Sequence, residues 1–131
     1  MNNSEIFSPT KLQRAKSVLR NLRVADPNIE ACAMVSNDGR PVASELNEAT
    51  NAERFSAMCA ALIALATRAG DEVQRGELRQ VILEGDCGVM LLTRTGDCGV
   101  LAVAAGPNAT LGRCIISARA AALELGLLYS L

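Results

Sequence analysis

The stretch from Thr50 to Arg75 constrains the fold most, because it is predicted to be a helix that needs cover on two sides. Thr50 and Glu53 have the spacing of a capping box, and Gly76 stands where a C-terminal glycine is expected. Apolar residues recur at helical spacing along one side: Phe55, Met58, Cys59, Leu62, Ala66, Ala69 and Val73.

The other side of this helix is lined with small residues. Over its first half it carries Ala57, Ala60, Ala61 and Ala64, and from Arg68 onward it becomes charged. A surface helix of a small domain normally has one apolar stripe and one charged side. Small side chains allow a second helix to approach closely, although alanine also occurs in helices for its propensity alone. A helix packed on one side only therefore remains an alternative.

The remaining segments indicate two further helices and five short strands. Ser8 and Pro9 begin a helix that Asp26-Pro27 ends, and Asn37-Asp38-Gly39-Arg40 has the composition of a hairpin turn. The expected strands cover residues 31–35, 41–46, 79–84, 89–94 and 100–105, and a last helix covers 110–128. The short loops favour antiparallel neighbours.

This order, α-β-β-α-β-β-β-α, predicts an α+β three-layer sandwich with a five-stranded antiparallel sheet and helices on both faces. Residues 89–92 and 100–105 are apolar at successive positions, which is typical of strands buried on both faces. If the terminal helices share one face, the central helix is alone on the other, and one helix cannot cover a sheet about 24 Å wide. We therefore expect a second copy of the central helix, and hence a homodimer.

Composition excludes several functional classes. The 131 residues fit a single domain over 1–131, with residues 1–7 as a polar arm. A net charge of −1 argues against a general nucleic-acid binder. No apolar run approaches the length of a membrane span, and the start lacks a signal-peptide pattern, so we expect a cytoplasmic protein.

No catalytic, cofactor or metal motif is found. The chain has no histidine, no phosphate-binding glycine loop and no closely spaced cysteine pair, so we expect a non-enzymatic protein without cofactors or metals. The five cysteines are expected to be mostly buried small apolar residues. Cys87 and Cys98 flank a predicted hairpin where they could approach each other, so a cysteine-dependent enzyme remains a remote alternative.

The first long helix has a basic side. Lys11, Arg14, Lys16, Arg20 and Arg23 occur without an intervening acid. Such a face could dock on an acidic partner or on anionic lipid. A merely solvated face is the alternative.

Three segments resemble roadblock/dynein-light-chain domains. They are residues 31–44 (ACAMVSNDGRPVAS), residues 76–84 (GELRQVILE), and the entry to the last helix at residues 108–113 (NATLGR). The first resembles the family's first hairpin and the second its step from the central helix to the third strand. The resemblance extends over roughly residues 8 to 128 in the family's order.

The resemblance implies a non-enzymatic, dimerising platform that regulates small Ras-like GTPases, as a regulator or as a scaffold. In that family the central helices pair antiparallel and the third strands join two sheets into one. Combined with the alanine side described above, this predicts a dimer interface at these residues: Ala57, Ala60, Ala61, Ala64, Arg68, Arg75, Arg79 and Val81. A profilin-like or longin-like adaptor for cytoskeletal or trafficking partners would share the layer pattern and remains the main alternative.

Overall fold

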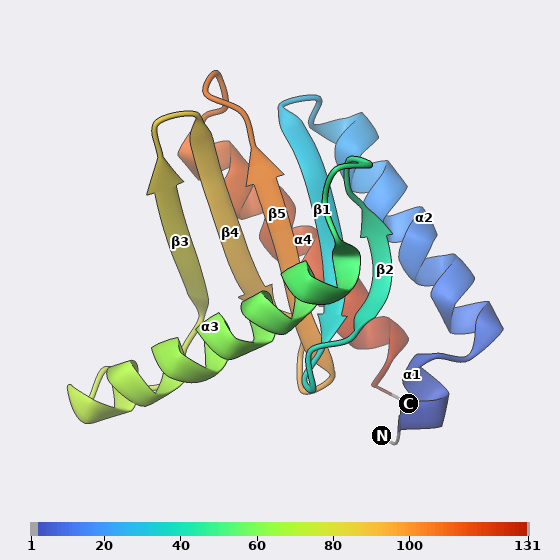
Figure 1. The fold of residues 1–131 in the computed structure, drawn as a ribbon, viewed down its shortest axis with the longest axis horizontal. Coiled ribbons are helices and arrows are strands. Elements are labelled where there is room, and N and C mark those ends of the chain that lie inside the picture. The colour runs from blue at the N-terminus through green and yellow to red at the C-terminus, as the bar shows by residue number, and fades with distance from the viewer. Residues whose placement is uncertain (1–2, 131) are drawn as a thin grey trace.

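The computed structural model describes residues 3–130 and contains four helices and five strands in that range (Figure 1). The elements follow one another as α1 (Asn3–Ile6), α2 (Pro9–Ala25), β1 (Ile29–Ser36), β2 (Pro41–Glu45), α3 (Ala52–Glu72), β3 (Gln80–Gly85), β4 (Gly88–Arg94), β5 (Gly99–Ala105) and α4 (Leu111–Leu128).

The strands form one antiparallel sheet in the order β2-β1-β5-β4-β3. Helices α2 and α4 pack against each other and cover one face, while α3 crosses the opposite face alone (Figure 1). The predicted three-layer α+β sandwich is thereby confirmed, including the shared face of the two long terminal helices. The strands β1 and β5 lie side by side in the middle of the sheet.

Two apolar clusters hold the layers together. The larger lies between the sheet and the α2/α4 pair, where Leu19, Met34, Leu101 and Leu125 are fully buried. The smaller lies under α3 and consists of Val35, Cys59, Ile63, Leu92, Val100 and Ala102. The central strands alternate between these clusters, as Leu91 and Leu92 do, which confirms that β4 and β5 are buried on both faces.

The N-terminal segment differs from the expected polar arm over residues 1–7. Residues 3–6 form the short helix α1, and Ile6 is buried in the larger cluster. Residues 1 and 2 of that predicted arm lie outside the described residues. Phe7 is half-buried and packs against the same cluster, so two adjacent apolar residues anchor the segment. Two apolar residues in a short polar sequence are a weak signal.

The ends of the central helix also differ from the prediction. The N-cap is Asn51, whose Oδ1 accepts a hydrogen bond from the Arg54 amide at 2.9 Å, and Thr50 is not the cap. Thr50 instead donates its hydroxyl to Asn47 at 3.0 Å. The helix ends at Glu72 and not at Arg75, because Gln74 takes a left-handed backbone conformation with φ 57°.

Candidate interaction surface

Strand β3 forms one edge of the sheet and is poorly covered on either side (Figure 1). Its residues from Ile82 to Gly85 are exposed, with Ile82 at 42% and Leu83 at 48%. These two neighbours point to opposite faces, since the side chains of a strand alternate. An edge strand also presents unpaired backbone donors and acceptors. The β3 edge therefore offers both hydrogen bonds and apolar contacts to another chain.

The outward side of α3 is exposed along its length. Ala57, Ala61, Ala64 and Arg68 of the predicted interface all lie on it. Met58 and Leu65 flank these alanines and are 57% and 63% exposed. The sequence pattern predicts Met58 on the side that faces the sheet, and that prediction is wrong. The inward side is formed by Ser56, Cys59 and Ile63, with Phe55 and Leu62 half-buried beside them.

Ala60 has a different environment from the other three alanines. It is half-buried and packs in the smaller cluster. Gly39, at the turn between β1 and β2, has φ +84°, and a Cβ added there would lie 3.5 Å from Ala60 Cβ and 3.3 Å from Ala57 Cα. The hairpin turn thus rests on this part of α3. Ala60 thus makes its contacts within its own chain.

The C-terminal part of α3 projects beyond the sheet (Figure 1). Residues 68–77 are exposed except Gly70, and Val73, expected on the buried side, is 59% exposed. Arg75 is exposed and its Nε donates to the carbonyl of Val73 at 3.0 Å. Of the remaining predicted interface residues, Arg79 is exposed and Val81 is half-buried against the smaller cluster.

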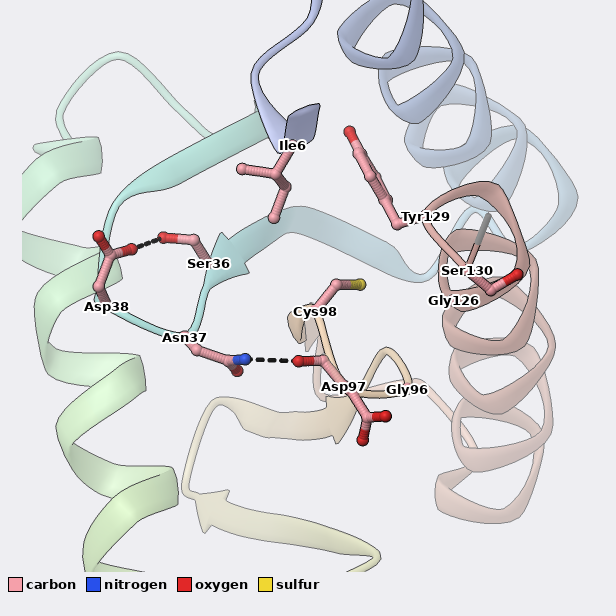
Figure 2. A pocket seen from close by; sticks show the side chains of 10 residues that line it. All are labelled: Ile6, Ser36, Asn37, Asp38, Gly96, Asp97, Cys98, Gly126, Tyr129 and Ser130. Carbon is pink, nitrogen blue, oxygen red and sulfur yellow. Dashed lines mark hydrogen bonds between the residues drawn. The ribbon is translucent and has the colours of Figure 1, made fainter. Parts of the chain in front are cut away.

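A pocket of about 450 Å³ lies at the end of the sheet where the β1–β2 and β4–β5 turns meet (Figure 2). Asn37 donates its side-chain amide to the carbonyl of Asp97 at 2.6 Å and so connects the two turns. Ile6 and the end of α4, with Tyr129, complete the wall. The Tyr129 hydroxyl is buried and has no hydrogen-bond partner among residues 3–130.

Cys98 is the only cysteine among the residues that line this pocket. Its Sγ donates to the carbonyl of Thr95 at 2.8 Å, and burial raises the pKa of the thiol above its ordinary value. Attack requires the thiolate, so a raised pKa makes Cys98 a poor nucleophile. Ser36, also in the wall, donates its hydroxyl to Asp38, and this bond lowers the pKa of the Asp38 carboxyl. Asp38 is therefore ionised at neutral pH.

The expected approach of Cys87 and Cys98 is wrong. Cys87 is exposed in the β3–β4 turn and Cys98 lies in the β4–β5 turn, at opposite ends of β4. At about 3.3 Å per residue, seven strand residues separate these ends by roughly 20 Å. Within residues 3–130 the five cysteines are free thiols, and no group of three or more metal-binding side chains occurs.

A broader hollow of about 940 Å³ runs along one flank of α4, below the ends of β3 and β4. Its wall mixes the acids Asp71, Glu77 and Asp97 with Arg79, Arg94 and Arg119. The hollow is open because α4 covers β4 and β5 and leaves β3 free. It thus adjoins the same uncovered sheet edge.

Sequence reasoning did not identify Met58, Leu65, Ile82 or Leu83 as exposed. Apolar residues occur around most of the α3 circumference, so the spacing alone does not fix the helix rotation. In β3, neighbouring apolar residues do not reveal whether the strand lies inside the sheet or at its edge, and the structure places it at the edge.

Comparison with known proteins identifies one sequence family and one fold. The sequence model of the Roadblock/LC7 domain family matches residues 16–105. Two uncharacterized proteins of Methanocaldococcus jannaschii are each 31% identical over 101 residues, which are 77% of this chain and 88% of the relative.

Solved structures share the fold at low identity. MglB of Myxococcus xanthus superimposes with a TM-score of 0.85 at 18% identity, covering 94% of this chain and 92% of that one. A Roadblock/LC7 domain from Streptomyces avermitilis has a TM-score of 0.81 at 21% identity, covering 88% and 98%. LokiProfilin1, solved with rabbit actin, has a TM-score of 0.61 at 14% identity, covering 88% and 96%. No helix within residues 3–130 is long and apolar enough to cross a bilayer.

Proposed function

This chain belongs to the Roadblock/LC7 domain family, and from that premise we propose that it is a homodimeric, non-enzymatic regulatory or scaffold protein for a small Ras-like GTPase. It would modulate the activity or the location of that GTPase. The observation that carries the proposal is the exposed surface formed by the outward side of α3 and the β3 edge.

The dimer interface we propose combines these two elements. Ala57, Ala61 and Ala64 allow the backbone of a second α3 to approach, while Met58 and Leu65 supply larger apolar contacts on the flank. The same patch on both copies is required in a twofold dimer. Most of the affinity would come from apolar area, at about 25 cal/mol per Å² before association costs are subtracted.

The β3 edges would pair antiparallel about the same axis. An antiparallel edge-to-edge pair has its twofold axis perpendicular to the sheet, so both copies of α3 lie on one side. Arg79 directly precedes β3 and Val81 lies at its beginning, so both would lie close to the partner's β3 in this pair. Arg68 and Arg75 on the projecting end of α3 would reach across to the partner's N-terminal turn, where exposed Glu53 lies. Exposed ion pairs of that kind add only about 0–1 kcal/mol.

The GTPase assignment rests on the family resemblance, and the chemistry of this chain is compatible with it. The sequence has no histidine and no phosphate-binding glycine loop. Burial raises the pKa of Cys98, the thiol beside the pocket. A platform that binds a GTPase needs neither a nucleotide site nor a nucleophile of its own.

A nucleotide-dependent pull-down tests the proposal. The immobilised protein is presented with small GTPases from its own cell, loaded either with GDP or with a non-hydrolysable GTP analogue. We expect retention of one GTPase that differs between the two nucleotides, and no GTP hydrolysis by the purified protein alone. Retention of no GTPase, or turnover of GTP by this chain alone, contradicts the proposal.

A profilin-like or longin-like adaptor is the second candidate, and the fold similarity to LokiProfilin1 is the observation that favours it. Such an adaptor would use the β3 edge or the pocket for a cytoskeletal or trafficking partner and would be a monomer by itself. The mass of the purified protein in solution separates the two candidates. A mass of one chain, 13.8 kDa, supports the adaptor, and twice that mass supports the homodimer.

A further inference from the structure

The charges of this protein are distributed unevenly along the chain. Helix α2 carries five of the 13 Lys and Arg residues and α4 carries two, whereas these helices contain one of the 14 acids, Glu124. The rest of the chain holds six basic and 13 acidic residues. The layer formed by α2 and α4, which we call the basic face, is thus net positive while the rest of the chain is net negative.

Most of these cations are free to meet a partner. Arg14, Lys16 and Arg20 are exposed on α2, and Arg113 and Arg119 are exposed on α4. Two others are engaged within the chain. Arg23 lies 3.8 Å from Glu45, and the ammonium of Lys11 sits 5.5 Å from the centre of the Tyr129 ring.

A row of aliphatic side chains runs along the same layer. Ile116, Ala120, Leu123 and Leu127 follow one another at spacings of four, three and four residues, which places them on one side of α4. The three large members are 72%, 66% and 63% exposed. They lie opposite the inward residues Cys114, Ala118 and Leu125. Val24, at the end of α2, is 80% exposed.

We propose that the basic face docks on the surface of a lipid bilayer that contains anionic headgroups. Cations attract the headgroups, and each Lys or Arg near such a surface strengthens binding about fivefold. Aliphatic side chains between them enter the boundary between headgroups and acyl chains, as in interfacial amphipathic helices. Both requirements are met on this layer, whereas α3 on the other layer carries two basic and three acidic residues.

Other occupants fit this face less well. A second copy would bring two faces of the same sign together, which is unfavourable. A partner helix would need a groove, but the hollow between α2 and α4, lined by Arg14 and Glu124, measures only about 260 Å³. A nucleic acid would use the cations and leave the aliphatic row in water. A bilayer surface uses both features and needs no groove.

The proposal requires only one copy of the chain and does not depend on the GTPase. In the homodimer proposed above, the perpendicular axis would place both basic faces on the same side of the continuous sheet. Both could then contact one bilayer at once, and the two α3 helices would lie on the side of the sheet away from it. Two linked contacts bind more tightly than one.

Vesicle co-sedimentation of the full chain tests the proposal. Phosphatidylcholine vesicles are compared with vesicles in which one third of the lipid is phosphatidylglycerol. We expect binding to the anionic vesicles only, and weakening of that binding as salt is added. Equal binding to both vesicle types, or binding to neither, overturns the proposal.

Two matched variants locate the contact. Arg20→Glu on α2 and Arg54→Glu on α3 change the net charge equally, and both positions are exposed. Arg20→Glu removes a favourable charge and adds an unfavourable one, so we expect about 25-fold weaker vesicle binding, with little change for Arg54→Glu. Equal weakening by both variants contradicts a defined face.

A third variant tests the aliphatic row. Ile116→Gln with Leu123→Gln removes two exposed side chains without touching the core. We expect loss of the binding that persists at high salt, with circular dichroism unchanged. If this variant binds like the parent, or if an acidic protein or DNA is bound at this face and vesicles are not, the bilayer proposal is wrong.

Discussion

Arg94 on β4 and Thr67 on α3 are joined by a hydrogen bond in which the guanidinium Nη2 donates to the threonine Oγ1 at 2.9 Å. The same hydroxyl donates to the carbonyl of Ile63 at 2.8 Å, so it acts both as an acceptor and as a donor. Beyond Thr67 the helix leaves the sheet. This pair therefore marks the point to which α3 is held by its own chain.

Thr67→Val is expected to loosen that attachment. The substitution keeps the side-chain shape and removes the hydroxyl, which leaves the half-buried Arg94 without this acceptor. We expect the free energy of unfolding to fall by about 1 kcal/mol, or a few degrees in Tm. Ser17→Ala is the control, since Ser17 makes only a bond to its own helix at Gln13. A larger effect for Ser17→Ala in thermal melts would contradict this role of Thr67.

The proposed dimer interface makes a prediction about Ala61 and Ala64. Replacing both with glutamate would set like charges across the twofold axis and bury them in part. We expect at least about 100-fold weaker dimerisation, with circular dichroism preserved because both positions are exposed. Ala60 is excluded from this variant, since it packs against its own hairpin.

Ala25→Glu with Ala120→Glu is the matched control for that variant, because both alanines are exposed on the other layer. Light scattering should give the mass of a dimer for the control and of a monomer for the interface variant. A dimer that survives Ala61→Glu with Ala64→Glu places the interface elsewhere.

Gly39 and Gly76 provide a second matched pair, because both have left-handed φ angles, +84° and +82°. An added Cβ meets the α3 backbone at Gly39 and open space at Gly76. We expect Gly76→Ala to cost about 1 kcal/mol from the backbone alone. Gly39→Ala should cost more, because the turn must also shift away from Ala57. If denaturant melts show equal losses of stability for the two variants, the contact between the new Cβ at residue 39 and Ala57 has no energetic cost.

The five thiols are expected to differ widely in reactivity. Cys87 is exposed and should be alkylated first, Cys98 more slowly, and the buried Cys32, Cys59 and Cys114 only after unfolding. Because all five are free, melts with and without reductant should coincide. Mass spectrometry of partially alkylated protein gives the order. A loss of many degrees on reduction would reveal a disulfide and contradict the structure.

Burial of the thiols also predicts alkaline sensitivity. Desolvation raises the pKa of Cys32 to about 12 and that of Cys59 to about 11, from an ordinary value of 9.0. Above pH 9.0 the unfolded chain loses these protons and the folded chain retains them, so the free energy of unfolding falls as pH rises. The slope is up to about 1.4 kcal/mol per pH unit for each thiol, until its folded pKa is reached.

Cys32→Ala checks this assignment. It should lower stability at neutral pH through lost packing and make the decline between pH 9 and 12 shallower. Denaturant melts across that range measure both effects. An unchanged slope would assign the alkaline loss to other groups, such as Tyr129, whose pKa burial raises to about 12.

The fold was largely predictable from the sequence because its signals are local. The Asn37–Arg40 turn and the long apolar runs of β4 and β5 suffice to indicate antiparallel neighbours and to place helices on both faces. The exact helix start was not predictable, since Thr50 and Asn51 are both good caps and neighbouring residues compete. The burial of Ile6 was not predicted because it depends on the β1–β2 and β4–β5 turns, which are distant in the sequence and line the same pocket.

The interaction surface was predictable only in part. The alanine side of α3 follows from spacing, and Ala57, Ala61 and Ala64 are exposed as expected. The rotation of the helix, which exposes Met58 and buries Ile63, depends on how α3 crosses the sheet. Local sequence contains no information on which half of a sheet a single helix leaves open. Only the family resemblance, in which the third strands of two copies join, implied an edge at the strand that contains Leu83.

The sheet order has a consequence for the synthesis of this protein. The central strands β1 and β5 pair from Ile29 with Ala105 to Ser36 with Gly99, so they come from distant parts of the chain. While a ribosome is still making the intervening residues, β1 has only β2 beside it. Pairings between distant segments form slowly and expose apolar surface until they close. The nascent chain must therefore keep Met34 and Val35 from aggregating until residue 105 has emerged.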